Sequence, residues 1–320
     1  MEEFGSICRE VLLWPEGVPS SNGLSGAEQT LGPGLIGNVS VPVLYVYPAS
    51  QPCGQAVILC PGGGFRGVAV EHEGRAFASW FNERGITLAV LKYRLPNGRR
   101  EIPGEDIRRA VRLLEERSGE LRIRSLGVMG ASIGGYVAAS AALFPETGMR
   151  PDFQILLYPV ISMRDGLTHL PSRERLMGPH PSGDEIAACS LDRYVSPETP
   201  AAFIALAGDD QAVTPENSLL YYRALMDNRV PASLHIYPEG GHGFGFSDTF
   251  RYKRQWLAEL EKWLDGLRER YFATGVRHKK TVARNAVGNA SSYFAGFSRG
   301  PFICGAGRFR AAGRGRPVRR

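Results

Sequence analysis

The 320-residue chain is poor in cysteine and has no long hydrophobic run. Its five cysteines are an odd number without metal-ligand spacing, which argues against a disulfide framework and against a zinc site. No segment approaches the roughly 20 apolar residues that a membrane-spanning helix needs, so we expect no membrane partner. Residues 1–5 also lack the basic and then apolar pattern of a secretory signal, which makes a cytoplasmic location the default expectation.

Acidic residues are absent from residues 273–320, which contain eleven of the 38 Lys and Arg residues. The preceding residues 1–272 therefore hold 27 basic and 32 acidic side chains, a net charge of −5, although the whole chain has a formal charge of +6. The segment is rich in Gly and Arg and has no apolar periodicity, which predicts a basic, disordered tail. Its arginines and aromatic residues are of the kind that bind RNA, but nothing else in the sequence favours a nucleic-acid partner.

Short apolar runs alternate with helical patterns before this tail. The helical patterns are clearest at residues 107–114 and 256–267, where apolar residues recur at helical spacing. A strand is expected at residues 41–47, and the apolar runs that follow it, typical of buried parallel strands, lie at residues 56–60, 86–93, 125–129, 153–158, 202–206 and 233–237. The alternation predicts one α/β domain over residues 1–272, with a mostly parallel central sheet and helices on both faces. Residues 15–40, rich in Gly, Pro and Ser, are expected on its surface.

Ser132 lies on a glycine-rich turn between a strand and a helix. Residues 130–134 (Gly-Ala-Ser-Ile-Gly) join the strand at residues 125–129 to a helical run of small residues at 136–143. A serine on such a turn is held in a strained conformation that exposes its hydroxyl, and the flanking glycines avoid collisions with the strand and the helix. Gly-rich turns also bind phosphate or serve packing, so the pattern alone is weak. Its context makes Ser132 the candidate nucleophile.

Two adjacent aspartates follow the strand at residues 202–206. We favour Asp210 as the acid that orients a histidine, because the Asp-x-x-Val spacing lets its carboxylate turn toward the histidine while Val213 packs under the sheet. Asp209 is the alternative, and both aspartates are also of the type that only caps a turn. Thr214 and Pro215 then predict an N-cap followed by proline at the first helical position.

His242 lies in a glycine-rich loop after the strand at residues 233–237. Glycines on both sides leave its imidazole free to reach a serine, whereas the other five histidines fit roles outside a site. The order Ser132, Asp210, His242 is the one used by α/β-hydrolases. Upstream, residues 61–65 (Pro-Gly-Gly-Gly-Phe) form a loop of small residues whose backbone N–H groups can bind an oxyanion.

Residues 162–199 interrupt the alternation with prolines and a short helix. Ser182 followed by Glu185 predicts a capping box at the start of that helix. An insertion after the strand that follows the serine turn is a common position for a lid over the acyl pocket, so we expect substrate contacts here. A structural connection without any contact to ligand is equally compatible with the sequence.

Beyond the individual motifs, residues 13–267 resemble the α/β-hydrolase carbohydrate esterases, which include acetyl xylan esterases and related feruloyl and acetyl esterases. The resemblance is carried by Leu13-Trp14-Pro15-Glu16-Gly17, Ser21-Asn22-Gly23-Leu24, Cys60-Pro61-Gly62-Gly63-Gly64-Phe65, His72-Glu73-Gly74, Tyr93-Arg94-Leu95-Pro96-Asn97-Gly98, Glu105-Asp106, Asp209-Asp210-x-x-Val213-x-Pro215-x-Asn217-Ser218 and His235-Ile236-Tyr237-Pro238-x-Gly240-Gly241-His242-Gly243-Phe244-Gly245. It places the family's nucleophile, acid and base on Ser132, Asp210 and His242, and its oxyanion loop on residues 62–64. Many such esterases are exported, which runs against the expectation of a cytoplasmic location.

Two residues depart from this family pattern. Ile133 stands where the family usually has alanine, and Tyr136 stands where it often has histidine. We expect the larger Ile133 side chain to lie beside the acyl site and to affect the size of the acyl group that is accepted.

These features predict a serine esterase that hydrolyses short acyl esters, with acetylated xylan or xylo-oligosaccharides as the substrates that the resemblance implies. Ser132, His242 and Asp210 would act as nucleophile, base and orienting acid, and backbone N–H groups of Gly63, Gly64 and Ile133 would bind the oxyanion. No metal or organic cofactor is expected.

Three alternatives remain open at this point. A general carboxylesterase or lipase would differ only in its acyl pocket. A prolyl-oligopeptidase-type peptidase shares the fold and the order of the triad, but the roughly 50 residues before the first core strands leave no room for the propeller that such enzymes usually carry. A non-catalytic binding protein of the same fold would be expected to lack a triad residue, and all three are present.

Overall fold

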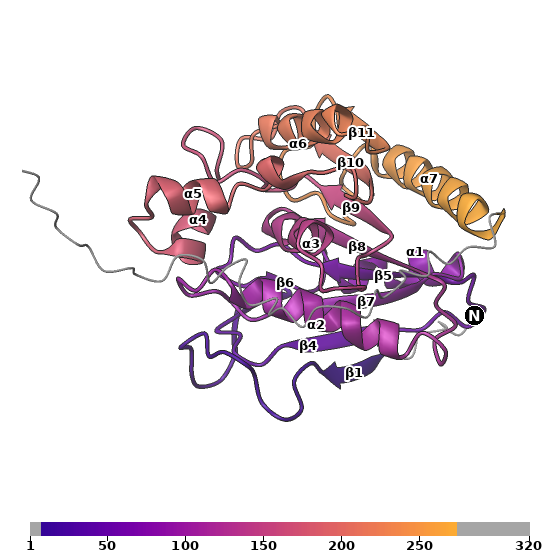
Figure 1. Ribbon diagram of the computed structural model, residues 1–320, viewed down its shortest axis with the longest axis horizontal. Helices are drawn as coiled ribbons and strands as arrows, with labels where there is room; N and C mark the ends of the chain where they lie inside the picture. Colours follow the sequence, from indigo (N-terminus) through magenta and orange to yellow (C-terminus); the bar gives the residue numbers. More distant parts are fainter. Residues whose placement is uncertain (1–7, 274–320) are drawn as a thin grey trace, which may run out of the picture. The chain divides into compact units, whose positions relative to one another are not determined.

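The computed structural model describes residues 8–273, whose strands form one large and one small sheet. The strands are β1 (Arg9–Leu12), β2 (Gln29–Gly32), β3 (Leu35–Gly37), β4 (Val43–Tyr47), β5 (Gln55–Cys60), β6 (Val68–Ala69), β7 (Thr87–Lys92), β8 (Ser125–Ala131), β9 (Phe153–Leu157), β10 (Ala201–Ala207) and β11 (Ala232–Tyr237). Eight of them form the large sheet, in the order β1-β4-β7-β5-β8-β9-β10-β11, and Figure 1 shows this sheet rising from β1 to β11. The six strands from β7 to β11 in this order are parallel, and β1 and β4 add an antiparallel edge.

Helices cover both faces of the large sheet. They are η1 (Arg75–Phe77), α1 (Ala78–Glu83), α2 (Ile102–Glu116), α3 (Ile133–Leu143), α4 (Leu170–Met177), α5 (Gly183–Ala188), η2 (Leu191–Tyr194), α6 (Glu216–Asp227) and α7 (Lys253–Ala273). α2 packs against α3, and both α3 and α6 contact η2, which places these helices in one layer. In the other layer an ion pair of 2.9 Å joins Arg84 at the end of α1 to Glu261 of α7. The predicted α/β fold with a mostly parallel sheet is therefore confirmed.

The central strands are buried along their whole length. Every residue of β5, β7, β8 and β9 is buried, as continuous apolar runs between two helical layers require. α3 consists mostly of small residues and is itself buried against β5, β8 and β9. The apolar stripe of α7 also faces the core, with Trp256, Leu260 and Leu264 fully or almost fully buried. This packing fixes the junction of β8 and α3, which carries Ser132.

Residues 15–40 contain more regular structure than their composition predicts. β2 and β3 pair antiparallel, and β3 pairs with β6 in a three-stranded sheet. The residues of β2 are exposed or half-buried, so the expectation of a surface segment holds, but the pairing was missed. Short strands with mixed polarity show no clear period of two, because most of their stability comes from the pairing itself.

One predicted helix start is wrong. α6 begins at Glu216, with Pro215 in the cap position and no capping hydrogen bond from a side chain. The Thr214 hydroxyl is buried and has no hydrogen-bond partner among the described residues, and its backbone oxygen instead accepts the N–H of Asn217. The contact to the start of the helix is thus made by the Thr214 backbone and not by its side chain.

The insertion at residues 162–199 contains α4, α5 and η2, and Figure 1 shows α4 and α5 at one end of the sheet. The predicted capping box is present, because the Ser182 hydroxyl accepts the Glu185 N–H at 3.2 Å and the Glu185 carboxylate accepts the Ser182 N–H at 2.9 Å.

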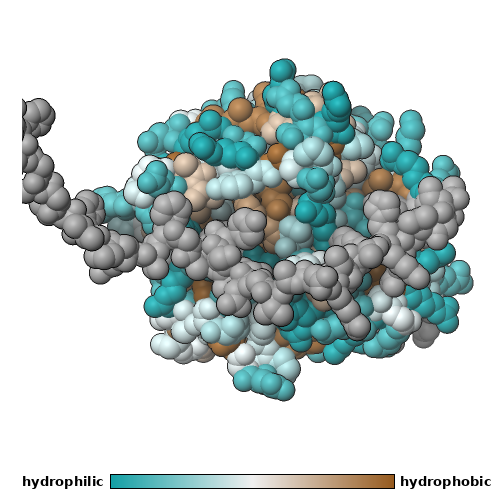
Figure 2. Space-filling model, viewed as in Figure 1, coloured by the Kyte–Doolittle hydropathy of each residue, from teal (hydrophilic) through white to brown (hydrophobic). Residues whose placement is uncertain are grey.

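The basic tail predicted for residues 273–320 lies outside the described residues, except for its first residue. On the face seen in Figure 2, hydrophilic residues predominate, and no helix of the described part is long and apolar enough to span a bilayer.

Candidate active site

Ser132 occupies a sharp turn between β8 and α3. Its backbone has φ 55° and ψ −125°, a conformation that a residue with a side chain rarely adopts. Two glycines make the turn possible. A Cβ on Gly130 would lie 2.1 Å from the Gly134 oxygen, and a Cβ on Gly134 would lie 2.0 Å from the Cys60 oxygen. The Ser132 N–H donates to the Leu157 oxygen of the neighbouring strand at 2.9 Å, which helps to hold the strained residue in place.

A continuous hydrogen-bonded chain joins Ser132, His242 and Asp210. The Ser132 hydroxyl lies 2.8 Å from His242 Nε2, and His242 Nδ1 lies 2.7 Å from Asp210 Oδ2. The Asp210 side chain has no exposed surface, whereas the His242 side chain is 22% exposed. The three residues follow β8, β10 and β11, so they meet at the carboxyl edge of the parallel strands although Ser132 and His242 are 110 residues apart.

The structure gives the two adjacent aspartates different environments. Asp210 turns inward, and its second oxygen accepts the N–H groups of Ala212 and Val213, both at 2.9 Å. Asp209 instead accepts the N–H groups of Gly241 at 2.8 Å and Gly240 at 3.2 Å. The Gly241 N–H bond is the main reason why the pKa of Asp209 lies below its ordinary value. Asp210 therefore contacts the histidine, and Asp209 supports the loop that carries it.

The Pro-Gly-Gly-Gly loop after β5 passes beside Ser132. Gly63 has φ 120° and Gly64 has φ 63°, both in the region that favours glycine. The N–H groups of Arg66 and Gly67 donate to the Gly63 oxygen and fold the loop tightly. Among the described residues, no hydrogen bond uses the N–H groups of Gly63 or Gly64. These groups are therefore available to bind an oxyanion.

Ile133 is the first residue of α3, where a helix leaves its N–H groups without intrahelical acceptors. Its side chain, however, is fully buried in the core. Contrary to expectation, this side chain therefore does not line the acyl site, because it offers no surface to a ligand. Tyr136, the second departure from the family pattern, is also buried, and burial raises the pKa of its hydroxyl well above the ordinary value.

Helix α4 contacts the glycine loop, which the sequence did not reveal. Arg175 donates from Nη1 to the Gly64 oxygen at 3.1 Å and to the Pro171 oxygen at 3.2 Å. The His169 ring lies close to Gly64, and its Nδ1 is 2.8 Å from the Ser172 hydroxyl. Burial, with smaller contributions from the charges of His242 and Arg175, lowers the pKa of His169 below 6.5. A neutral imidazole and a guanidinium thus border the site from the insertion.

Glu73 and Tyr158 were also missed as parts of the site. Glu73 entered the sequence analysis only as part of a family motif, and Tyr158 only as the end of a strand. Both are buried behind the glycine loop and are hydrogen-bonded to each other at 2.8 Å. No sequence signal could have paired two residues that are 85 positions apart.

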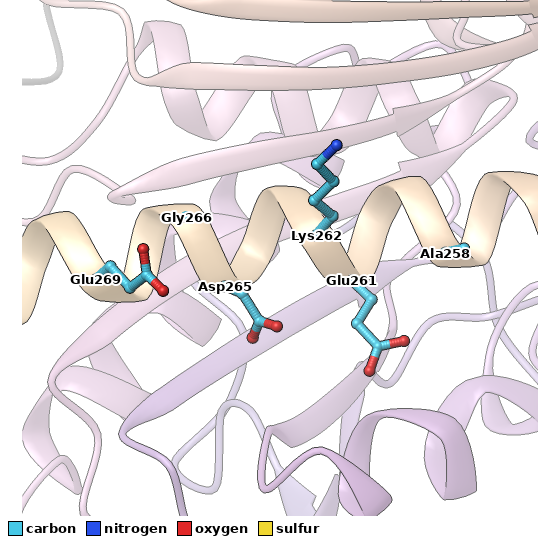
Figure 3. Close-up of a pocket in the computed structure, with 6 residues that line it drawn as sticks. All are labelled: Ala258, Glu261, Lys262, Asp265, Gly266 and Glu269. Carbon is cyan, nitrogen blue, oxygen red and sulfur yellow. The ribbon is translucent and has the colours of Figure 1, made fainter.

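Two surface hollows, each of about 510 Å³, differ in their relation to this site. One is lined by His242 and by residues of the adjoining loops, including Asp209, Glu239 and Arg251. The other is lined only by residues of α7, and Figure 3 shows that their side chains diverge along one open helix face. Only the first hollow reaches a residue of the candidate site.

Comparison with known proteins agrees with this geometry. Residues 93–269 match the model of the prolyl oligopeptidase family, and this segment includes Ser132, Asp210 and His242. The chain belongs to this family, and it is an α/β-hydrolase of the acetylxylan esterase-like type, as the sequence resemblance predicted.

Three relatives define the resemblance more closely. The acetylxylan esterase of Xylanibacter ruminicola is 36% identical over 223 residues, which are 68% of this chain and 46% of the relative. Endo-1,4-beta-xylanase B of Butyrivibrio fibrisolvens is 32% identical over 221 residues, 63% of this chain and 34% of that protein. The chain thus spans less than half the length of either relative. An acetyl ester-xyloside bifunctional hydrolase from Caldicellulosiruptor lactoaceticus matches with TM-score 0.70 and 32% identity, covering 81% of this chain and 96% of that structure.

Proposed function

We propose that this protein is a serine esterase that removes short acyl groups, above all acetyl, from carbohydrate esters of the xylan type. The observation that carries the proposal is the hydrogen-bonded chain from the Ser132 hydroxyl through His242 to the buried Asp210 carboxylate. A serine hydroxyl is a poor nucleophile unless a base takes its proton, and this chain places a base at 2.8 Å.

The first half of the reaction forms an acyl-enzyme. Ser132 Oγ attacks the ester carbonyl while its proton passes to His242 Nε2. Asp210 accepts the hydrogen bond from Nδ1–H, which selects the tautomer with a free Nε2 and stabilises the imidazolium. The imidazolium then gives its proton to the leaving alcohol as the carbon–oxygen bond of the ester breaks.

The backbone N–H groups of Ile133, Gly63 and Gly64 bind the negative oxygen of the tetrahedral intermediate. They are preorganised by the helix start and by the tight loop, so they need no rearrangement when charge develops. Losing one such donor would raise the barrier by about 3 kcal/mol. In the second half of the reaction water, activated by His242, attacks the acyl carbon and releases the free acid together with Ser132.

The substrate class rests on the relatives and on the insertion. An acetylxylan esterase and a xylanase are among the relatives. The structural neighbour from Caldicellulosiruptor lactoaceticus is named as an acetyl ester-xyloside bifunctional hydrolase. α4 brings His169 and Arg175 to the rim of the site, where hydrogen-bond donors suit the hydroxyl and ester oxygens of an acylated sugar. We therefore assign contacts with the sugar to the insertion at residues 162–199.

A general carboxylesterase and a peptidase are the competing functions. The family model that the chain matches is named after a peptidase, and the same triad would cleave peptide bonds. Substrate comparison separates the three.

The test measures release of p-nitrophenol from acetyl, butyryl and octanoyl esters, release of acetate from acetylated xylan, and cleavage of a prolyl p-nitroanilide. Ser132→Ala should abolish every true activity. Ser140→Ala is the matched control, because Ser140 lies two turns along α3 and, within the described residues, its hydroxyl donates to the Val137 oxygen of the same helix and to no other group. Serine-dependent activity on the acetyl ester and on xylan supports the proposal. Serine-dependent activity on the octanoyl ester or the anilide alone would replace it with the corresponding alternative.

A further inference from the structure

Glu73 is a buried carboxylate behind the candidate active site. It lies between β6 and η1 and is 3% exposed. One of its oxygens accepts the Gly62 N–H at 2.9 Å, and the other accepts the Tyr158 hydroxyl at 2.8 Å. Burying a carboxylate costs free energy unless it is hydrogen-bonded or paired. The described residues provide Glu73 with hydrogen bonds and no ion pair, so its burial does not stabilise the core. We therefore expect this carboxylate to have another role.

Tyr158 extends the contact to the histidine loop. Its hydroxyl oxygen accepts the Gly245 N–H at 2.8 Å, three residues after His242. Its ring stands edge-on to the His242 ring, with centroids 4.9 Å apart and an angle of 68°. Burial and the charge of Glu73 raise the pKa of the Tyr158 hydroxyl well above its ordinary value, so the hydroxyl keeps its proton and donates to Glu73.

The Glu73 carboxylate also lies next to the serine turn. A Cβ on Gly62 would lie 2.5 Å from the Glu73 oxygen and 2.9 Å from Ser132 Cβ, so both groups pack against the same glycine. Glu73 therefore holds the Gly62 N–H, directly before Gly63 and Gly64, whose N–H groups the proposed function assigns to the oxyanion.

We propose that Glu73 and Tyr158 are positioning residues. They hold the oxyanion loop and the His242 loop in their correct positions relative to Ser132. The chain of hydrogen bonds from Gly62 through Glu73 and Tyr158 to Gly245 connects the two loops behind the nucleophile. This inference rests on the proposed function. It adds that the geometry of the oxyanion-binding groups depends on a carboxylate that touches neither the substrate nor the triad.

The test uses Glu73→Gln and Tyr158→Phe in the full chain. Gln retains the size of Glu but offers an N–H₂ group where an acceptor is needed, so one of the two donors loses its partner. Phe retains the ring against His242 and removes the hydroxyl. We expect kcat for the acetyl ester to fall about 10- to 100-fold in each variant, because loops displaced by a fraction of an ångström to 1 Å bind the transition state less well. KM should change by less than about 3-fold, because ground-state contacts are retained.

Two further readouts separate positioning from a merely structural role. Affinity for a boronic acid, which forms a tetrahedral adduct with a nucleophilic serine, should fall by the same factor as kcat/KM. The double variant should be no slower than the slower single variant, because both residues belong to one chain of contacts. Glu71→Gln is the matched control, since Glu71 is an exposed neighbour whose carboxylate pairs with Arg75 at 3.1 Å and makes no other ion pair in the part of the chain that the structure describes.

The outcomes distinguish this inference from the function on which it depends. Absence of serine-dependent turnover in the wild-type protein overturns the proposed function and this inference with it. Serine-dependent turnover in the wild type together with near-normal kcat in both variants overturns the inference alone. If Glu73→Gln does not fold, as judged by its thermal midpoint, Tyr158→Phe decides the matter by the same criteria.

Discussion

Replacing Asp210 with Asn tests the site most directly, because the structure determines how the new amide would be oriented. One oxygen of Asp210 accepts two backbone N–H groups, those of Ala212 and Val213, both at 2.9 Å. In Asp210→Asn the amide oxygen will keep these two bonds. The amide N–H₂ group must then occupy the position of Oδ2, 2.7 Å from His242 Nδ1 in the native protein.

An N–H₂ group at that position can only donate a hydrogen bond. It favours the tautomer of His242 in which Nδ1 is the acceptor and Nε2 carries the proton. That tautomer cannot accept the proton of Ser132 Oγ, so the nucleophile is not activated. In serine hydrolases a change of this type lowers kcat by about 10⁴-fold, which corresponds to a barrier increase of about 5.5 kcal/mol.

The measurement is kcat for p-nitrophenyl acetate, with Asp209→Asn as the control. Asp209 accepts two N–H groups of the histidine loop, and its amide counterpart retains an acceptor for the shorter bond, from Gly241. We expect Asp209→Asn to keep kcat within about 10-fold of the wild-type value. Thermal unfolding of both variants shows whether any loss comes from misfolding.

A reversed pattern would refute this reasoning. If Asp209→Asn lost activity about 10⁴-fold and Asp210→Asn did not, the acid would be Asp209 and the histidine loop would have to rearrange in solution. If neither variant lost activity, the Asp210–His242 contact would have no catalytic role.

Three other perturbations follow from the fold and the site. Gly134→Ala should abolish turnover and lower the thermal midpoint, because its Cβ would lie 2.0 Å from the Cys60 oxygen; a fully active, equally stable variant would contradict this. Asp106→Asn should lower the free energy of unfolding by about 3 kcal/mol in denaturant titrations, because it leaves the fully buried Arg94 without its buried carboxylate partner; an unchanged midpoint would count against it. The pKa of His169 is lowered in the folded protein, so the unfolded chain binds this proton first as the pH falls below 6.5, and stability falls with it. His169→Gln should remove that part of the pH dependence of the thermal midpoint, and parallel curves for the two proteins between about pH 7 and 5 would exclude the effect.

The fold class was predictable because its central strands are buried on both faces. β5 is apolar after Gln55 and β9 is apolar except for Gln154, and the signal of such strands does not depend on knowing their neighbours. β2 and β3 were missed for the opposite reason, because their half-exposed residues carry no pattern and are defined by the pairing. Thr214 shows a third case, in which local capping chemistry predicts a hydrogen bond from the side chain and the backbone oxygen makes the contact instead.

The site divides in a similar way. The residues that meet at its centre stand at the ends of strands and carry local glycine patterns, so Ser132 and His242 were candidates from the sequence. The sequence favoured Asp210 as the acid but left Asp209 open. The orientation of each carboxylate depends on the backbone N–H groups that bind it, and these are known only from the folded chain. Glu73 could not be assigned a position at all, since its role follows from partners that only the folded chain brings to it.

The order of strands in the sheet has a consequence for folding kinetics. Ser132 follows β8 at the centre of the sheet, whereas His242 follows β11, the last strand at its edge. Contacts between residues so distant in sequence form slowly, and a chain that emerges from the ribosome in order completes β11 after every other strand. A partly folded molecule would hold the serine turn without its base. Recovery of activity during refolding should therefore lag behind the burial of aromatic residues that precede β8 in the chain, such as Trp80 and Tyr93, and hydrolysis itself would report a late step of folding.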